Sequence, residues 1–170
     1  MSSSQRYMRR GMTILEVLVA MAVLAVGLMA VISAIMSTSE LSLANQEELL
    51  AVNVVRQKLA EIKDTPFISI FSQYGPGTPN ATVDVSSLQA GTLQNGVLNI
   101  VFPVNAAGRL DETVVDAELG MPQDLNGNGV STDTDVSSTY TVLPVRIHVQ
   151  WTSRTGAREL SLNTMLTKLK

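Results

Sequence analysis

Glu16 is the only charged residue between Gly11 and Ser39, and it lies near the start of that long apolar stretch. An ionised carboxylate in apolar surroundings is costly unless it is protonated or paired, so ionisable residues in such segments are usually functional. The chemistry that Glu16 offers is therefore ion pairing with a cation in apolar surroundings. The alternative is an interfacial residue at the start of an ordinary membrane anchor, with its carboxylate turned back toward water.

A second group of oxygen-bearing side chains lies far downstream and offers cation binding. The sequence there matches the calcium-loop pattern D-x-[DN]-x-[DN]-G, with an acidic residue at the twelfth place. Alternating oxygen ligands around a glycine turn can converge on one hard cation. The predicted calcium ligands are Asp124, Asn126, Asn128, the Val130 carbonyl and Asp135.

Two departures from the pattern count against calcium in this loop. Asp135 is one carbon shorter than the bidentate glutamate usual at that place, and Ser131 stands where such loops generally have an apolar residue. Neither flank of the loop is typical of a helix. The same Asn-Gly sequence also favours a solvated turn without metal, so both interpretations stay open.

The element that carries Glu16 is predicted to be a membrane-spanning helix. The 23 residues from Val17 to Ser39 include no charge. At about 1.5 Å per residue they are long enough to cross a hydrocarbon core of roughly 30 Å. Arg6, Arg9 and Arg10 precede this stretch without any acidic residue, which places its N-terminal side in the cytoplasm. Everything after Ser39 is then expected outside the cytoplasm.

From Glu40 to Asp64 the apolar residues move to one side of the predicted helix, as is typical of a helix that lies against a domain. The apolar positions recur at spacings of three, four and once seven residues: Leu41, Ala44, Ala51, Val55, Leu59 and Ile62. Pro66 disfavours a helical residue before it, so the element is expected to end near Asp64. The sequence therefore predicts one continuous helix with an apolar first half and an amphipathic second half.

After Pro66 the sequence predicts loops and short strands, including a loop over Tyr74–Asn80. Strands are predicted over residues 96–104, 140–152 and 158–166. One face of the middle strand carries the apolar residues Val145, Ile147, Val149 and Trp151. We expect the last two strands to form an antiparallel hairpin whose apolar face packs on the long helix. The predicted fold class is α+β, with a long N-terminal membrane or bundle helix packed against a small antiparallel β-sheet head.

The remaining residues give little support to catalysis or to nucleic-acid binding. His148 is the only histidine and falls on the polar face of its strand, whereas Trp151 falls on the apolar face and is expected in the core. The chain has no cysteine and a net charge of −3, and the leader supplies three of its 12 basic residues and no acidic one. A chain without the leader is more acidic still, which disfavours nucleic acid as a partner. We expect no enzyme activity and no cofactor other than the candidate calcium ion.

The residues around Gly11 resemble the cleavage and methylation signature of type IV prepilins and type II secretion pseudopilins. The matching features are a basic leader that ends in Arg10-Gly11, an apolar Met12, and Glu16 four residues later at the start of an uncharged helix. The continuation EVLVAMAVLAVGLMAV is most similar to the minor pilins called PilV, and next to the pseudopilin GspI. The family usually has Phe at the first mature position, and Met12 departs from that while staying apolar.

This resemblance implies processing and assembly partners. In the family an inner-membrane prepilin peptidase cuts after the glycine, which here means between Gly11 and Met12, and methylates the new amine, here that of Met12. The counterpart of Glu16 pairs with the N-terminal amine of a neighbouring subunit and sets the axial register of the filament. The expected partners are the peptidase, other major and minor pilins, and inner-membrane lipid before assembly.

The resemblance also implies a division of the chain into four segments. Residues 1–11 are expected to form the prepilin leader and residues 12–39 the transmembrane and filament-core helix. Residues 40–66 then form the amphipathic half of the same helix, and residues 67–170 an extracytoplasmic β-rich head. The protein is expected to cross the inner membrane once, with its N-terminus in the cytoplasm, before it enters the periplasm or pilus.

Three hypotheses for the function follow. The first is a minor pilin that joins, initiates or caps a type IV pilus. It is favoured because abundant subunits of the family often close a C-terminal loop with a disulfide, whereas this chain has no cysteine. The second is a pseudopilin in the tip complex of a type II secretion system, and the third is a membrane-anchored periplasmic binding domain or enzyme.

Overall fold

The computed structural model describes residues 13–85, 94–154 and 156–168. The chain divides into two compact units between Leu43 and Ala44. Helix α1 (Ile14–Asp64) is continuous over 51 residues and contributes its first part to one unit and its second part to the other. The predicted leader, Gly11 and Met12 lie outside the described residues.

The N-terminal unit is the apolar part of α1. Its large apolar side chains are exposed on every side of the helix, from Ile14 at the start to Leu43 at the end of the unit. By length and composition α1 qualifies to cross a membrane, and none of its most apolar window is buried inside the protein. An all-round apolar helix without protein cover requires either lipid or neighbouring helices around it.

The second unit begins where the apolar residues of α1 become one-sided. Ala44, Ala51, Val55 and Ile62 are buried as the spacing predicts, and Leu59 is partly buried. Leu41 departs from the prediction. It is 66% exposed and belongs to the N-terminal unit, because the buried stripe begins only at Ala44.

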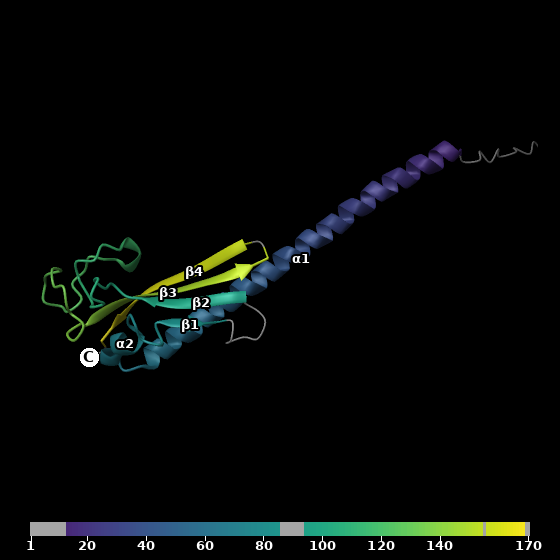
Figure 1. Cartoon of the computed structure of the whole chain (residues 1–170). Coiled ribbons are helices and arrows are strands. Elements are labelled where there is room, and N and C mark those ends of the chain that lie inside the picture. The colour runs from purple at the N-terminus through teal and green to yellow at the C-terminus, as the bar shows by residue number, and fades with distance from the viewer. Residues whose placement is uncertain (1–12, 86–93, 155, 169–170) are drawn as a thin grey trace, which may run out of the picture. The chain divides into compact units, whose positions relative to one another are not determined.

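Four strands of the described chain form one antiparallel sheet in the order β1-β2-β3-β4 (Figure 1). Their bounds are Thr82–Asp84 for β1, Gln94–Val101 for β2, Val142–Ser153 for β3 and Gly156–Thr167 for β4. The predicted α+β class and the hairpin of the last two strands are confirmed. Strand β2 ends at Val101 rather than Val104, since Pro103 has no N–H to donate to a ladder.

The core of the second unit lies between this sheet and the second part of α1. Val145, Ile147, Val149 and Trp151 of β3 are all buried, which confirms the predicted apolar face. They join Ala51, Val54, Val55 and Ile62 of α1 in one apolar cluster. The indole Nε1 of Trp151 also donates to Oε2 of Glu47 at 3.4 Å, which links β3 to the helix.

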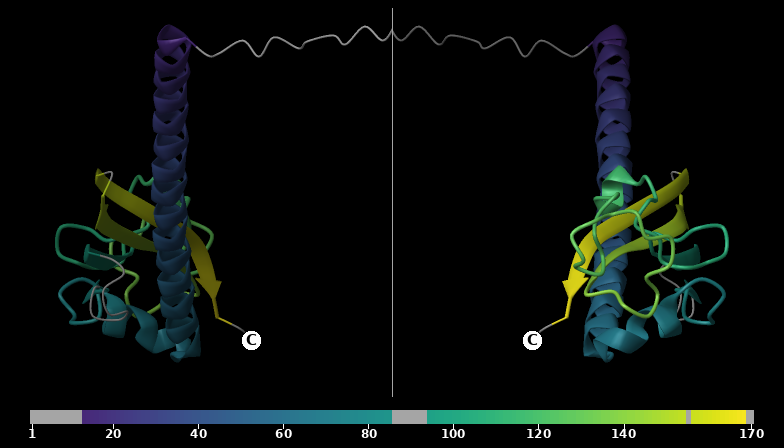
Figure 2. Two further views of the ribbon diagram at one scale, coloured as in Figure 1. Left: turned by 90° about the vertical axis from the view of Figure 1, so that its right-hand side faces the viewer. Right: turned by 90° about the vertical axis from the view of Figure 1, so that its left-hand side faces the viewer.

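A short helix, α2 (Phe67–Tyr74), occupies part of the segment that the sequence assigned to loops and strands. It lies beside the C-terminal end of α1 (Figure 2). Ile70 and Tyr74 are buried at helical spacing, and Pro66 stands at the N-cap, where its fixed φ suits the start of a helix. The sequence prediction was wrong here because it used Pro66 only as the end of one helix and not as the start of the next.

Candidate functional site

The first turn of α1 is capped by Thr13. Its Oγ1 accepts a hydrogen bond from the backbone N–H of Glu16 at 3.3 Å, and its carbonyl accepts one from Val17 at 3.2 Å. A threonine with a glutamate three residues later is the sequence signature of a capping box. Thr13 was not among the predicted site residues, although this signature is present in the sequence.

Glu16 is exposed in the first turn of α1, where a negative charge interacts favourably with the helix dipole. No cation pairs with it within residues 13–85, 94–154 and 156–168. The next basic residue along the chain is Arg56, some forty residues further on. Within the described residues of the N-terminal unit, the carboxylate of Glu16 therefore has no cationic partner.

The uncharged segment closes with three consecutive hydroxyl residues that satisfy their own hydrogen bonds. The side chains of Ser37, Thr38 and Ser39 donate to the carbonyls four residues earlier, at 3.0, 2.9 and 3.0 Å. Hydroxyls bonded in this way present no free donor to apolar surroundings. The segment between Glu16 and Glu40 is thus suited to lipid or to a helix bundle along its whole length.

A comparison with known protein families gives one match, to the prokaryotic N-terminal methylation motif over residues 6–37. It supports a type IV pilin-like or pseudopilin protein. The motif implies processing by a prepilin peptidase, membrane anchoring and assembly with other pilins, and proteins that carry it are structural subunits. No curated protein and no solved structure matches the chain.

The segment predicted to bind calcium forms a series of side-chain turns. Both carboxylate oxygens of Asp124 accept backbone N–H groups, Oδ1 from Gly127 at 2.6 Å and Oδ2 from Gly129 at 2.7 Å. Oδ1 of Asn126 accepts from the N–H of Asn128, and Oδ1 of Asn128 accepts from that of Val130. Three of the predicted ligands are thus brought together, with their oxygens bonded to the backbone.

The fifth predicted ligand, Asp135, has other partners. It forms an ion pair with Arg109 and accepts the N–H of Ser137 at 3.2 Å. Within the described parts of the chain, no three of the His, Asp or Glu side chains form a group that could hold a metal ion. Calcium binding stays a prediction, and an ion in this loop would compete with Arg109 for the carboxylate of Asp135.

Glu112 organises the same loop from inside the protein, and sequence reasoning missed it. This side chain is fully buried at 0% exposure. Its Oε1 accepts the N–H of Leu125 at 2.8 Å and of Asn126 at 3.2 Å, and its Oε2 accepts that of Asp133 at 3.3 Å. A buried carboxylate is tolerated when such donors replace its water. No local pattern marks Glu112, because the donors come from residues 13 to 21 positions later in the sequence.

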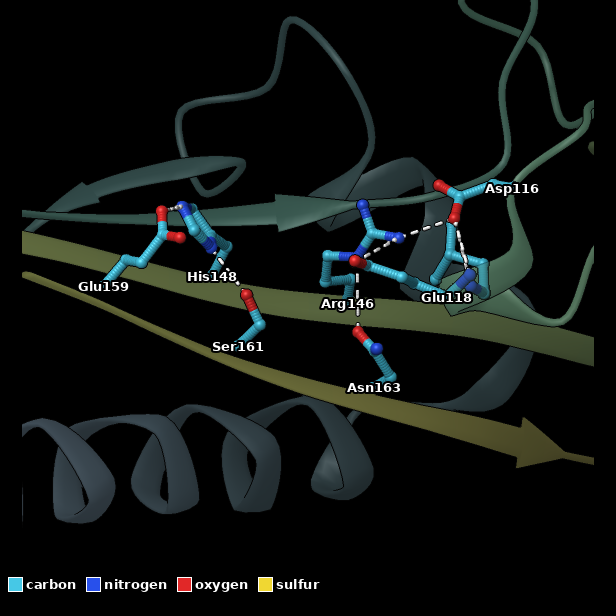
Figure 3. A network of polar contacts seen from close by, with 8 residues as sticks. Asp116, Glu118, Arg146, His148, Glu159, Ser161 and Asn163 are labelled. Atoms are coloured by element: carbon cyan, nitrogen blue, oxygen red, sulfur yellow. Dashed lines mark hydrogen bonds and ion pairs between the residues drawn. The ribbon is translucent and has the colours of Figure 1, made fainter.

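The outer face of the sheet carries a polar network (Figure 3). Arg146 of β3 donates to Asp116 at 2.6 Å and to Asn163 at 3.2 Å, and it lies 3.1 Å from Glu118. Burial would raise the pKa of Asp116, but the N–H of Leu119 and the Arg146 guanidinium lower it overall. The network fixes the short helix η1 (Ala117–Leu119) against β3 and β4.

His148 lies on the same outer face, as its place in the strand predicts. Its Nδ1 is 2.7 Å from Oγ of Ser161, and its Nε2 is 3.7 Å from Oε2 of Glu159 (Figure 3). Ser161 and Glu159 are exposed residues of an edge strand. The contacts orient the imidazole on the sheet surface.

Proposed function

We propose that this protein is a minor pilin, a structural subunit that is inserted in the inner membrane and then joins, initiates or caps a type IV pilus. The observation that carries the proposal is the N-terminal part of α1. This part of the helix is exposed and carries no charge after Glu16, whose backbone N–H is capped by Thr13. It coincides with the methylation motif.

The proposed mechanism rests on the carboxylate of Glu16. Cleavage between Gly11 and Met12 creates an ammonium at Met12, and methylation keeps that amine basic. A neighbouring subunit supplies such an amine to Glu16 as the two helices come together away from water. In low-dielectric surroundings an unpaired charge is costly, so the pair forms in one axial register and not in registers that leave Glu16 unmatched.

A second candidate is a pseudopilin in the tip complex of a type II secretion system, similar to GspI. Its N-terminal helix would use the same cleavage and the same ion pair. The two functions differ in where the processed protein is found. A tagged full-length chain recovered with sheared pili supports the minor pilin, whereas recovery only with secretion components supports the pseudopilin.

The variant Glu16→Ala tests the proposed role of the carboxylate. We expect normal membrane insertion, because the change makes the helix more apolar, and at least about a tenfold loss from sheared filaments, equivalent to about 1.4 kcal/mol. The matched control is Glu40→Ala, which removes an exposed carboxylate from the same helix beyond the uncharged segment. Equal amounts of wild-type and Glu16→Ala protein in the filament fraction would refute the assigned role.

A further inference from the structure

Strand β4 is an edge strand of the four-stranded sheet, so one side of its backbone has no neighbouring strand within the described chain. It is 12 residues long, and its last eight residues, from Leu160 to Thr167, include no charged residue and no proline. Natural proteins usually protect such an edge with charges, proline, bulges or a covering segment. A long, uncharged edge is therefore suited to pairing with another extended chain.

A groove follows the C-terminal end of this edge, and we call it the β4 groove. It has a volume of about 830 Å³. Phe67, Ile68 and Ile70 of α2 line one side, and Met165 and Leu166 of β4 line the other. Ile68 and Met165 are large apolar side chains that are 58% and 45% exposed. The groove thus offers apolar contacts beside the open backbone edge.

The charges that line the β4 groove are both positive. Lys63 from the end of α1 and Lys168 after β4 contribute to its walls, and no acidic residue does. The chain as a whole has a net charge of −3, so the lining of the groove departs from the overall sign. Two cations beside an apolar surface favour an occupant that combines apolar side chains with a carboxylate.

The α2 wall of the groove is held in place from behind. The hydroxyl of Tyr140 donates to the carbonyl of Phe67 at 2.7 Å and accepts the N–H of Phe71 at 3.5 Å. The rings of Phe67 and Tyr140 pack with their centroids 5.0 Å apart. A wall fixed by the buried Tyr140 needs little reorganisation on binding, which lowers the entropic cost of docking.

We propose that the β4 groove binds an extended, acidic segment of another protein, which pairs with the free edge of β4. The backbone of the segment forms hydrogen bonds with the uncharged stretch of β4 from Leu160 to Thr167. Alternate apolar side chains enter the groove over Ile68 and Met165. A carboxylate at the end of the segment pairs with Lys63 and Lys168. This is strand addition, in which backbone bonds give affinity and side-chain pockets give specificity.

Other occupants fit the same surface less well. An anionic lipid matches the cations and the apolar walls but makes no use of the open backbone edge. A second copy of β4 matches the edge, but its charged residues, Arg158 and Glu159, carry no net negative charge for Lys63 and Lys168. An acidic extended polypeptide alone satisfies the edge, the apolar walls and the cations together.

Photo-cross-linking of the full-length chain in the cells that produce it tests the proposal. The probe is p-benzoylphenylalanine in place of Met165, and the control is the same residue in place of Thr82 at the opposite edge of the sheet. We expect a protein adduct from position 165 only. Mass spectrometry should map it to an extended segment of a different protein that contains Asp or Glu.

Charge reversal then tests whether Lys63 and Lys168 bind the carboxylate of the segment. Lys63→Glu with Lys168→Glu should reduce the adduct at least about tenfold, equivalent to about 1.4 kcal/mol, whereas Lys63→Arg with Lys168→Arg should retain it. Both lysines are exposed, so an unchanged melting temperature should accompany each pair of substitutions. Replacing the mapped carboxylate by lysine should restore the adduct in the reversed variant.

Four outcomes would overturn the proposal. They are an adduct mainly with phospholipid, an adduct mainly with a second copy of this chain, an adduct indifferent to charge reversal, and equal cross-linking from positions 165 and 82. The test does not require cleavage of the leader or incorporation into a filament. Its failure would therefore leave the proposed pilin function standing, and the reverse also holds.

Discussion

Thr13 caps the first turn of α1, and its Oγ1 lies 3.3 Å from the backbone nitrogen of Glu16 in that turn. The hydrogen bond satisfies one of the four N–H groups that the first turn of a helix leaves without a partner. It also fixes the backbone from which the Glu16 side chain projects. The cap and the carboxylate proposed for assembly thus belong to a single turn, directly after the predicted cleavage bond in the sequence.

Thr13→Ala should destabilise this first turn by about 0.5 to 1 kcal/mol, because it removes the side-chain acceptor and leaves the N–H of Glu16 only the backbone carbonyl of residue 13, which accepts it at 3.0 Å. Amide hydrogen exchange of the full chain in detergent micelles should show faster exchange at Glu16 and Val17, with no change near Ala51. The control Thr13→Ser keeps the acceptor and should retain protection. Equal exchange in the Ala and wild-type chains would contradict the capping role.

Glu112→Gln should destabilise the folded second unit by roughly 1 to 3 kcal/mol, since an amide has one acceptor oxygen where the carboxylate has two. One of the buried N–H groups of Leu125, Asn126 and Asp133 then loses its partner. Thermal unfolding of the full chain measures the effect. The matched control is Glu48→Gln, an exposed position in α1, which should change the melting temperature little. Similar melting temperatures for the two variants would exclude this role for Glu112.

Calcium binding to the loop between Asp124 and Asp135 remains to be tested. If the ion binds, the melting temperature of the full chain should be higher in excess calcium than with a chelator, by linkage of about 2.7 kcal/mol at a hundredfold excess over Kd. Asp124→Ala should remove the difference, whereas Glu48→Gln, which alters an exposed carboxylate of α1 outside the loop, should keep it. Equal melting temperatures of the wild-type chain in millimolar calcium and in chelator would show that the loop is a solvated turn without metal.

The second unit should lose stability in acid through aspartates whose pKa values lie below the usual range, and three of them join Asp116 in this respect. The hydroxyl of Thr113 lowers the pKa of Asp111, the N–H of Gly129 that of Asp124, and the Arg109 guanidinium that of Asp135. Their folded-state values lie below the unfolded value of about 3.9, so their contribution is complete above that pH.

As the pH falls below about 4, these three carboxylates take up protons more readily in the unfolded chain than in the folded one. Stability is then lost progressively through the folded pKa values. Unfolding of the full chain between pH 2 and 7 should show this decline, with a shallower slope in Asp124→Asn. A slope below pH 4 that is the same in this variant would show that Asp124 contributes nothing to the acid transition.

The sequence predicted the elements whose pattern is long and regular. Helix α1 ends at Asp64 as Pro66 indicates, and the four apolar residues of β3 line the core because strict alternation leaves only one face to bury. The start of the amphipathic half was less well defined. Leu41 fits the spacing, but spacing alone does not say where the covering sheet begins.

The elements that sequence reasoning missed depend on distant partners. Strand β1 has only three residues, and its partner is β2, whose register no local pattern specifies. Helix α2 packs through Tyr140, some seventy positions further along the chain. Glu112 likewise has no local signature, since the loop donors that justify its burial are created by the tertiary fold.

The N-terminus of the mature protein tests the central proposal most directly. Intact-mass and peptide mass spectrometry of the full chain purified from membranes should show cleavage between Gly11 and Met12, with one methyl group on the amine of Met12. Only at that bond does a basic leader end in a small residue that is followed directly by the start of the apolar segment. A chain that retains Met1, or one that begins after the apolar stretch beyond about Ala30, would contradict the pilin account.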